Sequence, residues 1–131
     1  MLYCYIVMTK YLALNDIRAY KLAFNLSNAV WDIVNDWDYF AKDTVGKQFV
    51  RAVDSISANI AEGFGRYTKK DKIHFYRYSF GSVKESLDWN EKSFKRKLLK
   101  AEQHDLILKS LKELPLEVNH LIKFTNEKLT I

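Results

Sequence analysis

A basic and aromatic segment at residues 66–78 carries the residue types that could do chemistry in this sequence. Lysine and arginine neutralise phosphates and release counterions from nucleic acid, and an exposed ring such as Tyr67 can stack on an unpaired base. Lys70, Arg77 and Lys84 are seven residues apart, so they lie along one face of a helix. A second group of cations follows at 92–100. The candidate nucleic-acid-binding residues are Arg66, Tyr67, Lys69, Lys70, Lys72, Arg77, Lys84, Lys92, Lys95, Arg96, Lys97 and Lys100.

Positive charge is concentrated in the middle of the chain. The 131 residues have a formal net charge of +5. Residues 42–100 contain 14 Lys and Arg against 7 Asp and Glu, whereas residues 1–41 and 101–131 are each net −1. This asymmetry favours a face for RNA or DNA. The alternative is a solvated face that keeps the protein soluble or docks an acidic protein.

Other kinds of site find little support in the sequence. Gly63 and Gly65 follow a helical pattern rather than a strand, and no Gly-Lys-Ser/Thr completes a phosphate loop. His74, His104 and His120 lack the spacing of metal ligands, so we expect surface or capping histidines. No Ser, His and Asp pattern supports a nucleophile. We therefore expect no enzyme, no cofactor and no metal.

The N-terminal residues predict a short extension before a single domain. Cys4 is the only cysteine, which excludes a disulfide framework and suits the cytoplasm. Lys10 interrupts the apolar start well before the ~18 apolar residues that a membrane span needs. We expect an extension at 1–14 and one domain at 15–131. Met1 and Met8 are both candidate start residues.

The elements that must position the cations are helices. Apolar residues recur every three or four positions, which predicts helices at about 15–40, 44–62, 68–96 and 102–128. Asn15 is the expected cap of the first helix, Thr68 with Asp71 opens the third, and Pro115 should kink the fourth. Because short connections imply antiparallel neighbours, we expect an all-α, antiparallel up-and-down four-helix bundle.

Small residues suggest how these helices meet. We expect Gly63 and Gly65 to stop the second helix through a positive φ. Glu62 and Arg66 should form an ion pair at the same helix end, and Asn59 should be a buried hydrogen-bonding residue. A stripe of serines on the third helix predicts an additional packing face, as an oligomer would need: Ser79, Ser82, Ser86 and Ser93.

Residues 55–66 read Ser-Ile-Ser-Ala-Asn-Ile-Ala-Glu-Gly-Phe-Gly-Arg. This stretch resembles the signature of the small four-helix-bundle proteins named for intervening sequences in large-subunit ribosomal RNA genes. The resemblance extends upstream to Gln48, Arg51 and Ala52, and downstream to Phe75 and the Gly81-Ser82 step. It covers about residues 15–128, nearly the whole chain.

A related branch of that family contains the accessory variability determinant proteins of diversity-generating retroelements, which this chain resembles in size, charge and helix pattern. The resemblance implies a homopentamer that works with a reverse transcriptase and its template RNA. We therefore expect a non-enzymatic homo-oligomer that binds nucleic acid and presents template RNA to a reverse transcriptase. The alternative is an interaction scaffold that docks an acidic protein partner.

Overall fold

The computed structural model describes residues 13–129, which form four long helices and no strand. The long helices are α2 (Arg18–Asn35), α4 (Lys47–Phe64), α5 (Lys69–Lys95) and α6 (Ala101–Lys128). Three short pieces complete the described chain: the 3-10 turn η1 (Leu14–Asp16), α3 (Tyr39–Ala41) and the π-helical turn η2 (Lys42–Gly46). The predicted set of four helices is confirmed.

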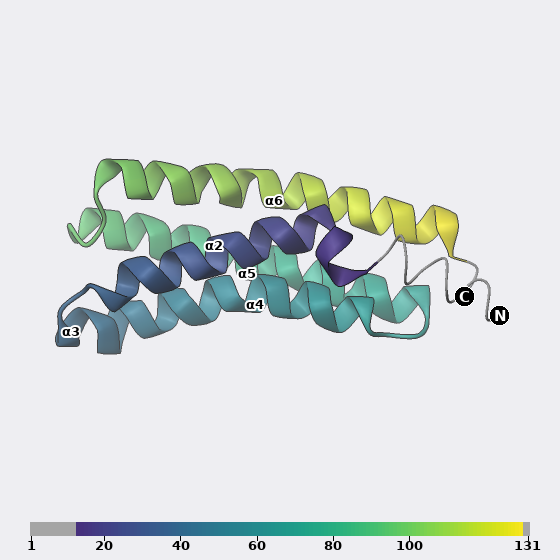
Figure 1. Cartoon of the computed structure of the whole chain (residues 1–131), viewed down its shortest axis with the longest axis horizontal. Helices are drawn as coiled ribbons and strands as arrows, with labels where there is room; N and C mark the ends of the chain where they lie inside the picture. Colours follow the sequence, from purple (N-terminus) through teal and green to yellow (C-terminus); the bar gives the residue numbers. More distant parts are fainter. Residues whose placement is uncertain (1–12, 130–131) are drawn as a thin grey trace.

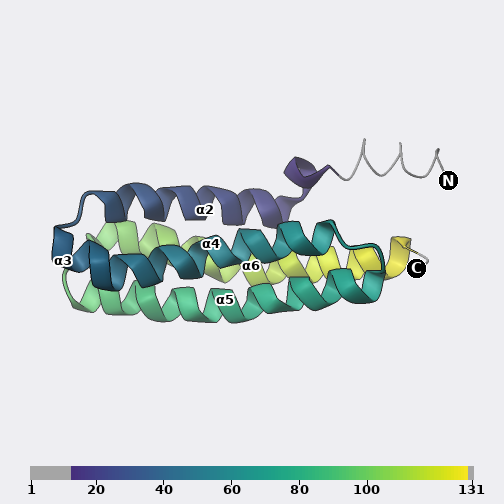
Figure 2. The same ribbon diagram turned by 90° about the horizontal axis from the view of Figure 1, so that it is seen from below.

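The four long helices lie side by side as a bundle (Figure 1). Both α2 and α5 pack against α4 and α6. The chain doubles back at each connection, so that α3 and the α5–α6 connection share one end of the bundle (Figure 2). The α4–α5 connection and the end of α6 lie at the other end. α6 runs as one helix through Pro115, and a kink there stays a prediction.

Large apolar side chains on α2, α4 and α6 fill the space between the helices. Phe49, Ile56 and Leu111 are completely buried, and each buried side chain of this size contributes about 1.5–3 kcal/mol. On α5 the buried positions include Tyr76 and Val83 as well as small groups. Its serines at 79, 86 and 93 have no exposed surface, so the prediction that they form a separate oligomer face is wrong. They face the interior, where their small size lets neighbouring helices approach.

The first long helix differs from its prediction at both ends. Asn15 lies in η1, and Ile17 is the N-cap instead, without a side-chain hydrogen bond. The helix also ends before Phe40, because Asp38 opens a new helix: its carboxylate accepts a hydrogen bond from the Ala41 N–H at 2.9 Å. This early end creates the α3 and η2 segment, which sequence periodicity does not predict.

Gly63 does not stop α4. The helix continues to Phe64, and the predicted stop at Gly65 is confirmed because Gly65 is the C-cap, but no glycine in residues 13–129 has a positive φ. The predicted positive-φ termination is therefore wrong. Gly63 is needed for close packing instead, since a Cβ atom there would lie 2.6 Å from Cε1 of Tyr76 and 2.8 Å from the carbonyl oxygen of Lys72. The absence of a side chain brings the end of α4 against the start of α5.

Asn59 helps to join the same two helices. Its side chain is half-buried. Its Nδ2 donates to the carbonyl of Ser55 at 2.9 Å and to Oγ of Ser82 on α5 at 3.5 Å. The predicted hydrogen-bonding role is confirmed, and it contributes to α4–α5 packing.

Candidate nucleic-acid interface

The outer side of α5 presents the exposed cations that the sequence predicts to lie on one face. Thr68 begins the helix by accepting a hydrogen bond from the Asp71 N–H at 3.2 Å, as expected. Lys70, Arg77 and Lys84 are all exposed. Within residues 13–129, none of the three forms an ion pair with a carboxylate. We call these three residues the α5 basic face.

A shallow hollow of about 400 Å³ lies beside the first turns of this face. It is lined by Lys69, Lys70, Ile73, His74, Arg77 and Asn126. Cations and an imidazole therefore surround it, and no carboxylate lines it. Such a surface is suited to an anionic group such as a phosphate.

Two of the predicted contact residues serve the fold. Lys72 is only 8% exposed, and its Nζ donates to the carbonyl of Phe64 at 2.6 Å. Burial lowers the pKa of its ammonium group. The prediction that Lys72 meets a phosphate is wrong, because its charge is turned inward. Lys69 donates to the carbonyls of Asn126 and Leu129, both at 3.2 Å, and so fastens α5 to the end of α6.

The connection before α5 presents an aromatic ring and a partly neutralised cation. Tyr67 is 73% exposed, so its ring is accessible for stacking. Arg66 forms the predicted ion pair with Glu62, at 2.5 Å, and its guanidinium carbon lies 4.4 Å from the centroid of the Phe75 ring. Because Arg66 is held by two partners, less of its charge is available to an incoming ligand.

The second group of cations lies at the far end of α5. We call it the distal basic cluster: Lys92, Lys95, Arg96, Lys97 and Lys100. Lys92 pairs with Asp88 at 2.6 Å, and Lys97 adopts a left-handed φ of 62° at the turn into α6. A helix of 27 residues is about 40 Å long. The structure therefore does not bring the two basic groups together.

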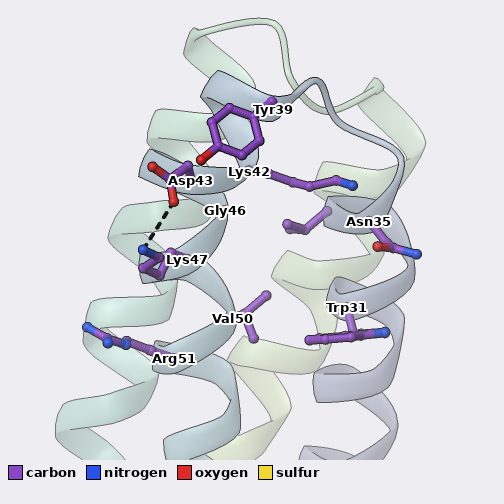
Figure 3. Close-up of a pocket in the computed structure, with 10 residues that line it drawn as sticks. Trp31, Asn35, Tyr39, Lys42, Asp43, Gly46, Lys47, Val50 and Arg51 are labelled. Atoms are coloured by element: carbon purple, nitrogen blue, oxygen red, sulfur yellow. Dashed lines mark ion pairs between the residues drawn. The ribbon is translucent and has the colours of Figure 1, made fainter.

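Sequence reasoning missed a groove of about 390 Å³ at the α3 end of the bundle (Figure 3). Its lining includes the exposed rings of Trp31 and Tyr39 and the cations Lys42 and Arg51. The groove exists because α2 ends early and η2 begins α4, which no periodicity reveals. The signal available in the sequence was the large ring of Tyr39 three residues before the cation Lys42.

His104 is buried at the α5–α6 corner and is not the surface histidine that we expected. Its Nε2 lies 2.6 Å from Oε1 of Glu91, and its Nδ1 lies 3.1 Å from Oδ1 of Asp105. The hydrogen bond with Glu91 is the main cause that raises the pKa of His104. Its ring stacks on Phe94 at 4.4 Å between centroids. This cluster therefore joins two helices and is formed best when the imidazole is protonated.

Two other classes of site are not found among residues 13–129. No group of three or more His, Cys, Asp or Glu side chains is placed to hold a metal ion. None of the helices in this part of the chain is long and apolar enough to cross a membrane.

Comparison with known proteins identifies the family. No curated protein matches the chain. The model of the 23S rRNA-intervening sequence protein family matches residues 15–120, which span α2 to α5 and most of α6. The match covers the 55–66 signature, the exposed side of α5 and the distal basic cluster. The chain therefore belongs to the 23S rRNA-intervening sequence protein family.

Proposed function

We propose that this protein is a non-enzymatic, homo-oligomeric nucleic-acid-binding protein that holds phosphates against the α5 basic face. The observation that carries the proposal is the regular exposure of Lys70, Arg77 and Lys84 without carboxylate partners among residues 13–129. Seven helical residues span about 10 Å, close to the rise of three nucleotides along a duplex strand. Each cation can therefore meet a separate phosphate.

Assembly into a pentamer is part of this proposal. Five copies would present five α5 basic faces, so weak contacts with one nucleic acid would add through effective concentration. Exposed apolar side chains support a further interface: Leu106 is 68% and Leu116 is 58% exposed on α6. Burial of such apolar side chains against a second copy of the chain would stabilise an oligomer.

In its specific form, the proposal is an accessory subunit that presents template RNA to a reverse transcriptase in a diversity-generating retroelement. Its support is the shared size, basic charge and four-helix pattern of the branch that the sequence resembles. Co-purification of a reverse transcriptase and its template RNA with the tagged protein, sensitive to ribonuclease, is the expected result. Recovery of neither would contradict this role and leave general nucleic-acid binding in place.

One observation favours a second candidate function, a scaffold that docks an acidic protein partner. Leu106 and Leu116 are exposed apolar side chains on α6, and exposed apolar surface is typical of a protein-binding site rather than of a phosphate contact. Pull-down from host lysate, with and without nuclease, separates the two functions. Partners that persist after nuclease treatment would support the scaffold.

Charge reversal on the α5 basic face tests the main proposal. The variant Lys70→Glu, Arg77→Glu, Lys84→Glu removes three candidate phosphate contacts on exposed positions. Fluorescence anisotropy with a structured RNA and a matched DNA duplex, over a salt series, measures both affinity and the number of phosphates neutralised. Each lost contact lowers the salt slope by about 0.7 to 0.9.

A matched control makes the same charge change elsewhere. Three exposed lysines of α6 are reversed to glutamate in it: Lys109, Lys112 and Lys123. We expect the α5 variant to lose affinity and slope while the control keeps most of both. Equal losses in the two variants would mean that overall charge, rather than this face, holds the nucleic acid. Unchanged binding in the α5 variant would refute the proposal.

A further inference from the structure

The groove at the α3 end combines a hydrophobic floor with exposed aromatic walls. It opens between α2 and α4, next to η2, and is lined by Trp31, Val34, Asn35, Tyr39, Lys42, Asp43, Gly46, Lys47, Val50 and Arg51. Figure 3 shows Trp31 on the α2 side of the groove with Val50 beside it, and Tyr39 at the α3 end of the groove. Trp31 is 57% and Tyr39 is 79% exposed. Two large rings therefore border one apolar hollow on the surface.

The floor of the groove is fixed by close backbone packing. Gly46 is buried, and a Cβ atom there would lie 2.6 Å from Cγ1 of Val34. The segment that carries it is a π-helical turn, a distortion that occurs frequently at functional sites. Gly46 therefore lies directly against α2, and the floor of the groove is part of the packing between α2 and the start of α4.

Cations line the rim of the groove. Lys47 pairs with Asp43 at 3.1 Å, so this acid and this base neutralise each other. Lys42 and Arg51 also belong to the lining, and neither forms an ion pair within the described residues 13–129. An occupant with a flat aromatic part and a negative part fits this combination, and a neutral apolar segment would leave the cations unused.

Further positive charge lies at the end of the bundle that holds the groove. The distal basic cluster lies at the same end of the bundle as α3 (Figure 1). A strand with one base in the groove would therefore find further cations for its neighbouring phosphates. A duplex could not use the groove in this way, since its bases are stacked within the helix.

We infer that this groove binds one unpaired base of a single-stranded nucleic acid, stacked against Trp31 and bordered by Tyr39, with the adjoining phosphates on Lys42 and Arg51. The inference rests on the proposed function and deepens it, because it adds a preference for unpaired strands. The α5 basic face neutralises phosphates of any strand, whereas the groove selects strands whose bases are free.

The experiment compares a fluorescein-labelled oligouridylate with a short RNA duplex on the intact protein. Trp31→Ala and Tyr39→Ala each remove one ring, and both rings are largely exposed, so the fold should be kept. Phe24→Ala is the matched control: it removes an exposed ring from α2, seven residues before Trp31 and outside the groove lining. Trp31→Phe tests rescue, because it keeps a ring that can stack.

We expect Trp31→Ala to weaken oligouridylate binding by about fivefold or more, the range expected for one base–aromatic stack. Duplex affinity and the salt slope should not change, since no phosphate contact is lost. Phe24→Ala should behave as the wild type, and Trp31→Phe should recover most of the affinity.

Three results would overturn the inference, and they are distinguishable. Unchanged oligouridylate affinity in both alanine variants, together with loss of binding in the α5 charge-reversal variant, would refute the groove and retain the proposed function. Failure of the wild type to bind either RNA would refute both. A smaller oligomer for Trp31→Ala on size-exclusion chromatography would assign the groove to a second copy of the chain.

Discussion

A methyl group added at Gly63 should destabilise the bundle, although alanine is normally the better helix residue. In an open helix, Gly→Ala stabilises by about 1 kcal/mol. At Gly63 the new Cβ would lie 2.6 and 2.7 Å from two ring carbons of Tyr76 and 2.8 Å from the backbone oxygen of Lys72. The ring is 2% exposed, so it has no room to move. Overpacking of this kind costs about 1–3 kcal/mol.

Because one of the clashing atoms is backbone, we expect the upper end of that range and a net loss of about 2 kcal/mol after the gain in helix propensity. For a domain of 131 residues, 1 kcal/mol corresponds to about 3–4 °C in Tm. Gly63→Ala should therefore lower Tm by about 7 °C in thermal unfolding followed by far-UV circular dichroism.

Gly81 is the matched control on the neighbouring helix. It lies in the middle of α5, and a Cβ atom there would meet nothing within 4 Å. Gly81→Ala should raise Tm by about 3 °C, since only the helix-propensity gain remains. A Gly63→Ala variant as stable as Gly81→Ala would refute the close-approach argument, because it would show that α4 and α5 can separate without cost.

The remaining predictions concern the α5–α6 corner and the interior of α6. The hydrogen bond with Glu91 raises the pKa of His104 above its ordinary value of 6.5. The contribution of this pair to the free energy of unfolding should therefore be complete below about pH 6.5 and be lost as the pH rises through the raised pKa. Glu91→Gln should flatten this dependence in chemical denaturation across pH, and an unchanged profile would contradict the assignment. Pro115→Ala should restore a backbone donor inside α6 and raise Tm, whereas a fall in Tm would show that the proline is needed for packing.

The periodicity of apolar residues was sufficient to predict four helices, because each helix buries one continuous stripe. The start of α5 was also predictable, because Thr68 caps it through a local hydrogen bond that needs no tertiary information. The early end of α2 was not predictable in the same way. It depends on Asp38 capping a new turn, and a Trp37-Asp38-Tyr39 sequence is equally compatible with a continuing helix.

The candidate interface was predicted in part, for a related reason. A count of cations cannot distinguish a lysine that faces solvent from one that faces the interior. Lys70 and Lys72 are two residues apart, yet Lys70 is exposed whereas Lys72 is buried, with 8% of its surface exposed. The serine positions of α5 were misassigned because small residues permit close approach on either side of a helix. Only the packing of α4 and α6 determines which side is covered.

Lys72 differs from the exposed lysines of α5 in which residues could replace it. At Lys70 and Lys84 the charge faces water, so arginine could replace lysine with little consequence for either fold or charge. At Lys72 a compact ammonium reaches one carbonyl of α4 within the protein, and a planar, permanently charged guanidinium would bring donors that this site does not satisfy. Among related sequences we therefore expect either lysine or arginine at positions 70 and 84, and lysine alone at position 72.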